Sequence, residues 1–305
     1  MKYLYYPGCS LEGTALEYNR STCSLMKALG MELVEIDDWS CCGASAATTV
    51  SELLSLVLPA RNLALAEKMC EETGEMLDIL VPCSACYLNL KKVSEQAAVD
   101  PALLDRLNTI LAEDGLKFKN RLPVRHLLDV LSKDIDMNAL AANIISPLSG
   151  VSAAPYYGCQ CLRPYPVFDD PEKPQSMDAL IRACGALPYT WDMGAACCGA
   201  SHMNTKPEVG QALVGRILSR AENADVILTV CPMCQMNLEG YQKKIGHACH
   251  KTFHTSILYL PQFIGMALGL SEDRTRMDLN LSITADFKRK IENLPRTTLT
   301  NASSG

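Results

Sequence analysis

The chain has 305 residues, and its 28 basic and 34 acidic side chains give a net charge of −6. This charge gives no electrostatic reason to expect a nucleic acid or an anionic membrane as partner. The length suits two domains of roughly 150 residues each. No apolar window reaches the roughly 18 residues of a spanning helix, and the opening residues lack a secretory signal pattern. We therefore expect a cytoplasmic protein without a membrane span.

Strands and helices are predicted to alternate along the first half. Strands are expected at 2–7, 31–36 and 78–81, with helices at 13–29 and 50–70 between them. In the first helix, Leu16, Cys23, Met26 and Leu29 are the expected apolar positions, and Gly30 is the expected cap. The strand at 31–36 leads to a pair of adjacent cysteines, and the strand at 78–81 leads to a CxxC motif.

The second half repeats this order. Strands are expected at 153–157, 187–191 and 225–230, and helices at 175–184 and 206–222. Related segments, 122–128 and 255–260, close the two halves. Such alternation predicts a mostly parallel sheet covered on both faces, with ligands bound beyond the carboxyl ends of the strands. We expect domains at 1–150 and 151–270, followed by a polar, partly flexible arm at 271–305 with one helix near 283–291.

A five-cysteine pattern occurs twice in the chain. The first set is Cys9, Cys41, Cys42, Cys83 and Cys86, and the second is Cys159, Cys197, Cys198, Cys231 and Cys234. Their surroundings agree closely: YYPGC at 5–9 matches YYGC at 156–159, and CCGAS occurs at both 41–45 and 197–201. Likewise ILVPCSAC at 79–86 parallels ILTVCPMC at 227–234, and Asn-Leu follows each. In a reducing compartment, cysteines in such a pattern indicate metal ligation or redox chemistry rather than disulfides.

Thiolate-rich sites select zinc, copper(I) or iron–sulfur clusters. Five ligands exceed the four that zinc or an ordinary [4Fe–4S] cube takes, and adjacent cysteines rarely chelate one tetrahedral ion together. Either one cysteine per half is not a ligand, or the cluster is unusual. Gly8 and Gly158 would let the backbone approach a cluster closely. Gly43 and Gly199 would free amide N–H groups for bonds to sulfur.

The doubled CxnCCGxnCxxC pattern resembles the cysteine-rich CCG domain family, and residues 1–270 are similar to the B subunits of heterodisulfide reductases. The element Gly158-Cys159 followed by Arg163-Pro164 is also typical of the family's second repeat. The resemblance implies an α/β fold of two tandem, pseudo-symmetric Rossmann-like domains with mostly parallel sheets. It also implies two noncubane [4Fe-4S] clusters. One would take Cys9, Cys41, Cys42, Cys83 and Cys86, and the other Cys159, Cys197, Cys198, Cys231 and Cys234.

The same resemblance implies cleavage of the coenzyme M–coenzyme B disulfide between the two clusters. Electrons would come from the ferredoxin-like C subunit of such a complex, which is fed by its flavin-containing A subunit together with a hydrogenase or formate dehydrogenase module. One alternative keeps the fold in another redox complex, such as a thiol:fumarate reductase, a lactate-oxidation complex or a bacterial heterodisulfide reductase-like assembly. The other is a pure electron-transfer subunit, and a coenzyme-sized cleft between the clusters would argue against it.

One position departs from the family pattern. The residue after the second-half lead cysteine is often His in the family, whereas here it is Gln160, followed by an additional Cys161. An amide cannot serve as an acid, so we expect the proton from His202, Tyr157 or solvent. Cys161 is expected not to be a ligand.

Other chemistry-bearing residues have plainer interpretations. We expect Cys23, Cys70 and Cys184 to be core residues. The cluster of His247, Cys249, His250 and His254 is interpreted as a solvated loop rather than a metal site. Arg163 and Lys206 are candidates for anionic groups of the substrate. Trp39 and Trp191, each shortly before a cysteine pair, are expected to shield a cluster, and 257–270 with the tail is the expected surface for docking other subunits.

Overall fold

The computed structural model describes residues 1–294 as two parallel four-stranded sheets. The first has the order β2-β1-β3-β4 and the second the order β6-β5-β7-β8, so each half places its strands in the same relative order. The strands of the first half are β1 (Lys2–Tyr5), β2 (Glu32–Glu35), β3 (Ile79–Val81) and β4 (Val124–His126). Those of the second are β5 (Ser152–Tyr156), β6 (Leu187–Pro188), β7 (Val226–Thr229) and β8 (Ser256–Tyr259). The predicted α/β class with tandem parallel sheets is confirmed.

Helices connect consecutive strands. In the first half they are α1 (Cys9–Glu12), α2 (Leu16–Ala28), α3 (Ala46–Val50), α4 (Glu52–Thr73), α5 (Ser84–Val99), α6 (Pro101–Leu111), η1 (Ala112–Asp114), α7 (Leu127–Lys133) and α8 (Met137–Ala142). In the second they are α9 (Ser176–Ala183), α10 (His202–Thr205), α11 (Pro207–Arg220), α12 (Pro232–Gly240), α13 (Gln242–Cys249) and α14 (Leu260–Ala267). The chain then continues through α15 (Glu272–Thr275), η2 (Met277–Leu279) and α16 (Ala285–Glu292). Within residues 1–294, no helix combines the length and apolar character needed to cross a bilayer.

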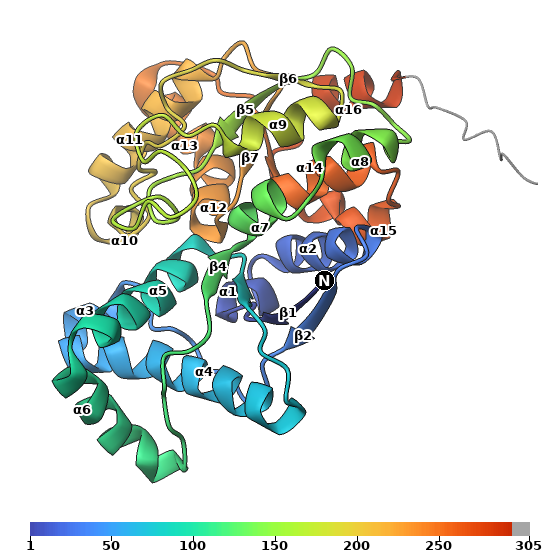
Figure 1. Cartoon of the computed structure of the whole chain (residues 1–305). Coiled ribbons are helices and arrows are strands. Elements are labelled where there is room, and N and C mark those ends of the chain that lie inside the picture. The colour runs from blue at the N-terminus through green and yellow to red at the C-terminus, as the bar shows by residue number, and fades with distance from the viewer. Residues whose placement is uncertain (295–305) are drawn as a thin grey trace, which may run out of the picture.

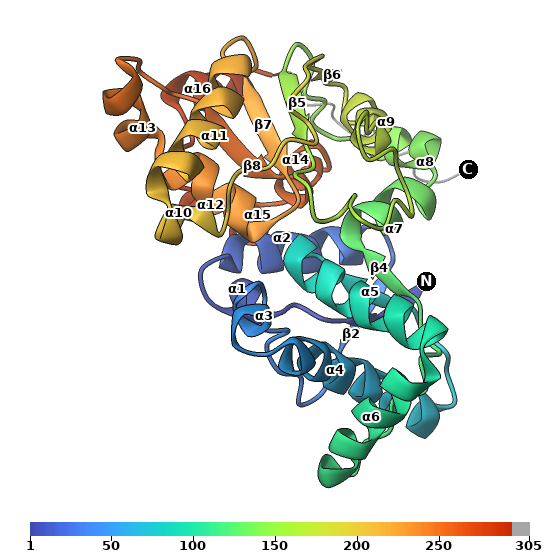
Figure 2. The same cartoon turned by 90° about the vertical axis from the view of Figure 1, so that its left-hand side faces the viewer.

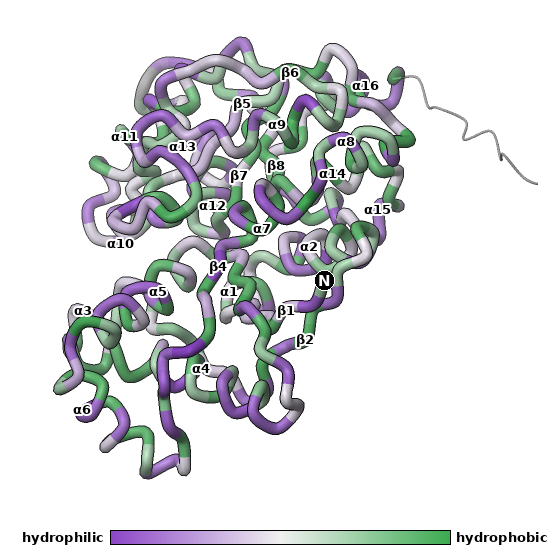
Figure 3. The backbone as a smooth tube through the Cα atoms, viewed as in Figure 1, coloured by the Kyte–Doolittle hydropathy of each residue, from purple (hydrophilic) through white to green (hydrophobic). Residues whose placement is uncertain are grey.

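The two halves form two lobes, with β4, α7 and α2 lying where the lobes meet (Figures 1 and 2). Polar and apolar residues alternate along α4 and α6 (Figure 3). The rings of Tyr18 and Tyr259 stack across the junction at a centroid distance of 4.1 Å. Both rings are almost completely buried, and α2 packs against α14 around them. This shared core fixes one lobe against the other.

The expected strands and helices form close to their predicted bounds, but the buried face of α2 differs from the prediction. Leu16 is exposed and Cys23 is exposed, whereas Tyr18, Thr22 and Leu25 are buried. The prediction assumed that only apolar residues would be buried, but the buried face of α2 includes polar side chains such as Thr22. The prediction that Cys23 is a core residue is therefore wrong. Cys70 and Cys184 are buried, as predicted.

The segment 257–270 is also not the docking surface that its apolar sequence suggested. β8 pairs with β7, and α14 packs on α2. Ile257, Leu258, Phe263 and Ile264 are completely buried by these contacts. The apolar run is used by the core of the protein itself. The final 295–305 of the predicted arm lie outside the described residues.

The described part of the arm packs against the second lobe through polar contacts. Asn280 donates to the Glu239 carboxylate at 3.2 Å and to the Ile257 carbonyl at 3.1 Å, while Ser256 and Thr284 hydroxyls lie 3.0 Å apart. Burial raises the pKa of Glu239 to about 7. The arm therefore covers the carboxyl group of Glu239, and burial favours the neutral, protonated form of this group.

Replacing Glu239 with glutamine is expected to remove a pH dependence of stability. Because the folded-state pKa is raised, the folded state binds the proton more tightly than the unfolded chain. The contribution of Glu239 to stability is therefore greatest below the unfolded pKa of 4.5 and is lost as the pH rises through about 7. Above that pH, Glu239→Gln should raise the free energy of unfolding by about 2–3 kcal/mol. Urea unfolding from pH 4 to 8 checks this, with the exposed Glu113→Gln as control. An identical slope in wild type and Glu239→Gln would contradict it.

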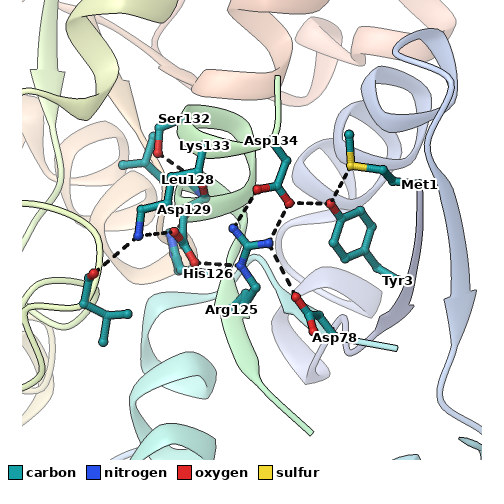
Figure 4. Close-up of polar contacts among 11 residues, drawn as sticks. Met1, Tyr3, Asp78, Arg125, His126, Leu128, Asp129, Ser132, Lys133 and Asp134 are labelled. Carbon is teal, nitrogen blue, oxygen red and sulfur yellow. Dashed lines mark hydrogen bonds and ion pairs between the residues drawn. The ribbon is translucent and has the colours of Figure 1, made fainter. Parts of the chain in front are cut away.

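An ion-pair network anchors the junction at β4 and α7 (Figure 4). Arg125 donates from Nε to Asp129 at 2.8 Å and from its two terminal nitrogens to Asp134 at 2.5 and 3.0 Å. The Tyr3 hydroxyl donates to the same Asp134 carboxylate at 2.6 Å. Lys133 reaches the carbonyl of Val167 in the second half at 3.3 Å. The network thereby ties β1, β4 and α7 together and orients the residue between Arg125 and α7, which is His126.

Candidate cysteine-ligated functional site

The cysteines lie directly after strands, where parallel sheets bind ligands. β1 is followed by Cys9 at the start of α1, and β3 is followed by Cys83 at the N-cap of α5. In the second half, β7 is followed by Cys231 at the N-cap of α12. The helices α5 and α12 each carry the last cysteine of a set in their first turn. Neither helix was predicted from sequence, because a CxxC motif marks a ligand pair without indicating the element that follows.

Within each half four of the five thiols form two pairs, and the pairs match between the halves. Cys42 Sγ lies 3.4 Å from Cys86 Sγ, and the equivalent Cys198 Sγ lies 3.5 Å from Cys234 Sγ. Cys9 and Cys41 thiols are 3.4 Å apart, and the thiols of Cys159 and Cys197 interact in the same way. The structure thus brings together the two sets that the spacing singled out, with the same internal arrangement.

Two further pairs of equivalent residues hold the turns that carry the adjacent cysteines. The hydroxyl of Tyr6 donates to the Ser40 carbonyl, and that of Tyr156 donates to the Ala196 carbonyl, both at 2.7 Å. Asn89 donates to the Cys42 carbonyl at 3.2 Å, and Asn237 donates to the Cys198 carbonyl at 3.3 Å. Each asparagine amide also lies near the thiol of the same cysteine, at 3.5 and 3.7 Å respectively.

Trp39 and Trp191 support these turns from behind. The Trp39 ring packs edge-on against Tyr6 at 5.4 Å, and Trp191 packs against Tyr156 at 6.2 Å. The Trp191 indole N–H donates to the Pro155 carbonyl at 3.0 Å. Both rings therefore stand beside the tyrosines that hold the cysteine turns, on the protein side of the site.

Glycines provide the space around the last thiol of each set. A Cβ on Gly8 would lie 2.7 Å from Cys86 Sγ, and a Cβ on Gly158 would lie 3.0 Å from Cys234 Sγ. Both glycines also have positive φ, 72° and 69°, which L side chains rarely adopt. At these two positions the backbone approaches a cysteine sulfur of its own set closely, which leaves no room for a side chain.

Replacing Gly8 with alanine is expected to remove the cofactor of the first set. The new methyl group would displace Cys86 Sγ, so iron bound per chain should fall by about half. Gly30→Ala is a matched control, because Gly30 has a φ of 71° but nothing within 4 Å of its Cβ position. Both variants should lose about 1 kcal/mol of stability through backbone strain. Iron analysis of both variants checks this prediction. A full iron content in Gly8→Ala would contradict the role of Gly8 in leaving space for Cys86 Sγ.

The thiols of Cys42 and Cys197, like that of the buried Cys231, are held in an environment that lowers the pKa and favours the thiolate. Hydrogen bonds from Cys41 and Cys86, together with the Ala44 amide and Asn89, lower the pKa of Cys42 to about 3. A hydrogen bond from Cys159, the amides of Gly199 and Ala200, and nearby His202 lower the pKa of Cys197 to about 5. Because the thiolate is the form that binds metals, these positions are prepared for ligation.

The two sets adjoin at the junction of the lobes. The thiol of Cys83 in the first set lies close to that of Cys231 in the second, and both are buried. A cavity of about 120 Å³ opens beside them, and all five second-set cysteines line it. Gln160, Tyr157, His202 and, from the first half, Ser84 also line it, together with Met233 and 199–201. Cys9, Cys41 and Cys197 are exposed, so each set has one side turned to solvent.

The remaining candidates lie apart from this cavity. The guanidinium of Arg163 donates to the Ala195 carbonyl at 2.6 Å and to Glu172 at 3.1 Å, so it supports the loop before Cys197. Lys206 is exposed and does not line the cavity. Cys161 is buried, and its thiol donates to the Tyr157 carbonyl at 3.2 Å. His247, His250 and His254 line a separate groove with Lys243 and Lys251.

The donor set fits an iron–sulfur cofactor. Ten thiols converge in two groups, glycines leave room beside Cys86 and Cys234, and amide groups face the sulfurs of Cys42 and Cys197. Iron–sulfur clusters take thiolate ligands and hydrogen bonds of this kind. Among the side chains that the structure describes, no three His, Cys, Asp or Glu are arranged to hold a single metal ion.

Comparison with known proteins places the chain in a family. The profile of the cysteine-rich domain, CCG, matches residues 3–91 and again 153–239, which together span more than half of the chain. This chain belongs to the cysteine-rich CCG domain family. The family resemblance seen in the cysteine spacing is therefore confirmed, and each matched segment contains one complete five-cysteine set.

Full-length relatives within the family are redox proteins by name. The chain is 32% identical to the 8-methylmenaquinol:fumarate reductase membrane anchor subunit of Wolinella succinogenes, covering 92% of this chain and 96% of the relative. It is 28% identical to a protein of Archaeoglobus profundus named as like the B subunit of heterodisulfide reductase, covering 90% and 93%. The B subunit of the ferredoxin/F420H2-dependent CoB-CoM heterodisulfide reductase of Methanosarcina acetivorans is 26% identical, covering 95% and 97%. These relatives support an oxidoreductase role in a complex of several subunits.

A solved structure shares the fold. The crystal structure of a hypothetical protein from Helicobacter pylori superposes with a TM-score of 0.74 at 14% identity. It covers 93% of this chain, and the chain spans about half, 52%, of that protein. This likeness concerns the architecture of the two lobes alone.

Two residues of the site carry no signal in the sequence. Ser84 lines the second-set cavity although it belongs to the first half, and His126 lies behind it with Nε2 at 3.2 Å from Ser84 Oγ. Ser84 lies inside the CxxC motif, but its counterpart in the second half is Pro232. The repeat therefore gave no reason to select it, and His126 stands 33 residues before the nearest motif cysteine, Cys159 (159 − 126 = 33).

Proposed function

We propose that this protein is the disulfide-cleaving subunit of a heterodisulfide reductase-type complex, with the coenzyme M–coenzyme B disulfide as substrate. The observation that carries the proposal is the contact between Cys83 and Cys231, which sets the two five-cysteine groups side by side. The cavity beside Cys231 is lined by the second set and, from the first half, by Ser84, so a disulfide bound there would contact the second set next to its boundary with the first. The names of the Methanosarcina relatives support the choice of substrate.

Each cysteine set is assigned one noncubane [4Fe-4S] cluster. Cys9, Cys41, Cys42, Cys83 and Cys86 would hold the first, and Cys159, Cys197, Cys198, Cys231 and Cys234 would hold the second. Disulfide cleavage requires two electrons, and a cluster of this class supplies one. The chain supplies the thiolates, the hydrogen bonds of Asn89 and Asn237 to the cysteine turns, and the glycine clearance beside Cys86 and Cys234.

The side chains that line the cavity are not equally suited to act as the proton donor. Gln160 has no acidic proton, and burial raises the pKa of Tyr157 far above its ordinary value. The Tyr157 hydroxyl also accepts a hydrogen bond from the Met177 amide at 2.9 Å. His202 lines the same cavity and is exposed to solvent. We therefore assign proton delivery from solvent to His202.

The partners belong to the same proposal. The ferredoxin-like C subunit of a heterodisulfide reductase, with its flavin-containing A subunit, would bring electrons from a hydrogenase or formate dehydrogenase module. The complex would act in the cytoplasm. The exposed sides of Cys9, Cys41 and Cys197 are the positions where an electron donor or a substrate can approach the two sets.

A second candidate function is favoured by one relative. The 32% identity to a subunit of a methylmenaquinol:fumarate reductase over nearly the whole of both chains supports an electron-transferring role in a fumarate-reducing complex. The fold and the cysteine ligands would be the same in that case. The donor and the acceptor would differ, and no external thiol would need to bind at the second set.

The deciding experiment is iron and acid-labile sulfide analysis of anaerobically prepared protein, with EPR spectra recorded before and after coenzyme M under mild oxidation. The proposal expects about eight irons per chain, as two four-iron clusters require, and a signal changed by the thiol. About eight irons with no thiol effect would favour the fumarate reductase-type role. About four irons, or zinc, would overturn the two-cluster assignment.

A further inference from the structure

The second-set cavity is closed by a side chain from the other half of the protein. Apart from Ser84, every residue that lines it belongs to 157–234. Ser84 is the first residue of α5, next to Cys83, and its side chain is almost completely buried. Its hydroxyl donates to the carbonyl of Val230, the residue before Cys231, at 3.1 Å. A first-half hydroxyl is thus placed at the boundary between the two sets.

His126 holds this hydroxyl from behind. Its ring is completely buried, stacked on Phe168 at 6.0 Å and packed against the edge of Tyr87. Burial lowers the pKa of His126 to about 4, so the imidazole is neutral near pH 7. The Leu128 amide donates to Nδ1 at 3.2 Å, so the single ring proton belongs on Nε2. Nε2 then donates to Ser84 Oγ, 3.2 Å away.

This arrangement fixes the roles of the Ser84 atoms. Because Oγ accepts from His126, the hydroxyl proton is left free to donate elsewhere. In the present structure it is directed to the Val230 carbonyl, but the hydroxyl also reaches a sulfur: a bond from Ser84 counteracts part of the rise that burial causes in the pKa of Cys161. The Ser84 hydroxyl therefore lies within reach of the Cys161 sulfur as well as of the Val230 carbonyl, while its side chain lines the second-set cavity.

We propose that Ser84, held by His126, is a hydrogen-bond donor to an anionic sulfur atom in the second-set cavity. The shared chemistry is a negatively charged sulfur, and it has two sources: the thiolate of a bound substrate or a sulfur of the cofactor itself. This inference rests on the proposed function. Ser84 would be the residue through which the first half acts on the second-half centre, and His126 would be a positioning residue.

A purely structural tie between the lobes explains these contacts less well. Tyr18 and Tyr259 already join the lobes through an extensive buried stack. A fully buried histidine that serves only packing has no need to present its single N–H to a hydroxyl beside ten thiols. Burying such polar groups is unfavourable unless each is bonded, and here each one is: the Leu128 amide donates to Nδ1, Nε2 donates to Oγ, and the Ser84 hydroxyl donates to the Val230 carbonyl.

The test uses anaerobically prepared, cluster-loaded protein and the variants Ser84→Ala and Ser84→Thr. Ser256→Ala is the matched control, because Ser256 is equally buried and bonds Thr284 at 3.0 Å, away from the cavity. Two quantities are measured: the affinity for coenzyme M, followed by EPR, and the reduction potential of the second-set centre without thiol. Iron content and the midpoint of thermal unfolding are recorded for each variant.

If the acceptor is the bound thiolate, Ser84→Ala should bind coenzyme M about 10- to 100-fold more weakly while Ser84→Thr binds it like wild type. If the acceptor is a cofactor sulfur, Ser84→Ala should instead lower the reduction potential, by about 59 mV for each tenfold change in a one-electron equilibrium. Unchanged affinity and potential in Ser84→Ala, or changes that Ser256→Ala shares, would overturn the inference. Absence of any thiol effect in wild type, with the potential of Ser84→Ala unchanged, would overturn the proposed function together with it.

Discussion

Replacing Cys231 with alanine is expected to remove about half of the bound iron and to lower the rate of disulfide reduction by more than about 100-fold. Cys231 is buried at the N-cap of α12, where its thiol interacts with Cys234 in its own set and with Cys83 in the other. Its loss therefore removes a ligand and breaks the contact between the two sets.

Cys161→Ala is the control for this substitution. Cys161 is as completely buried, and its thiol bonds the Tyr157 carbonyl rather than a motif cysteine. We expect this variant to keep its iron and to lose only the modest stability of a small buried side chain. Iron analysis and the rate of coenzyme M–coenzyme B disulfide reduction by a reduced viologen dye give the two readings. Full iron in Cys231→Ala, or iron loss in Cys161→Ala, would show that the ligand assignment is wrong.

Replacing Arg125 with alanine is expected to lower the free energy of unfolding by about 3–5 kcal/mol. Arg125 pairs with Asp129 and Asp134 at the lobe junction, where the three side chains are only 17%, 5% and 19% exposed. Removing the guanidinium leaves two poorly hydrated carboxylates with only Lys133 beside Asp129 and the Tyr3 hydroxyl on Asp134. The midpoint of thermal unfolding should fall by roughly 10 °C for a protein of this size.

The control is Arg220→Ala, because Arg220 pairs with Asp192 on the surface, where the two side chains are 61% and 58% exposed. An exposed pair of this kind contributes less than about 1 kcal/mol. The two variants should also differ in acid. Burial opposes ionisation of Asp134, but its bonds to Arg125 and Tyr3 hold its pKa below the ordinary 3.8, so its stabilisation is lost as the pH falls through that range. A fall in midpoint no larger than that of Arg220→Ala would contradict the role of the network.

The second cysteine set shows why the cysteines of the candidate site could be selected from the sequence. Ligand cysteines must follow strands and carry glycine beside them, and both constraints act over a few residues. Gly158, Cys197 and Cys198 therefore leave a local pattern that a repeat makes visible. The strand and helix order follows from local periodicity in the same manner, and the parallel sheets were predicted on that basis.

Packing between segments that are far apart in the chain could not be predicted from the sequence in the same way. Cys23 was expected in the core, yet α2 buries Tyr18 and Thr22 against the second lobe instead. The apolar run at 257–270 suggested a docking surface, although β8 and α14 bury it within the protein. In both cases the composition of one segment gives its tendency to be buried but not the partner that covers it.

The sequence by itself determined the fold class, the repeat and the ten cysteines of the candidate site, because each depends on residues close together in the chain. The tertiary structure decided that the sets meet at Cys83 and Cys231 and that Ser84 and His126 stand at that boundary. These relations join residues up to 148 positions apart, as the separation of Cys83 and Cys231 shows (231 − 83 = 148). Such contacts depend on how two independently formed sheets pack, and no local pattern encodes that packing.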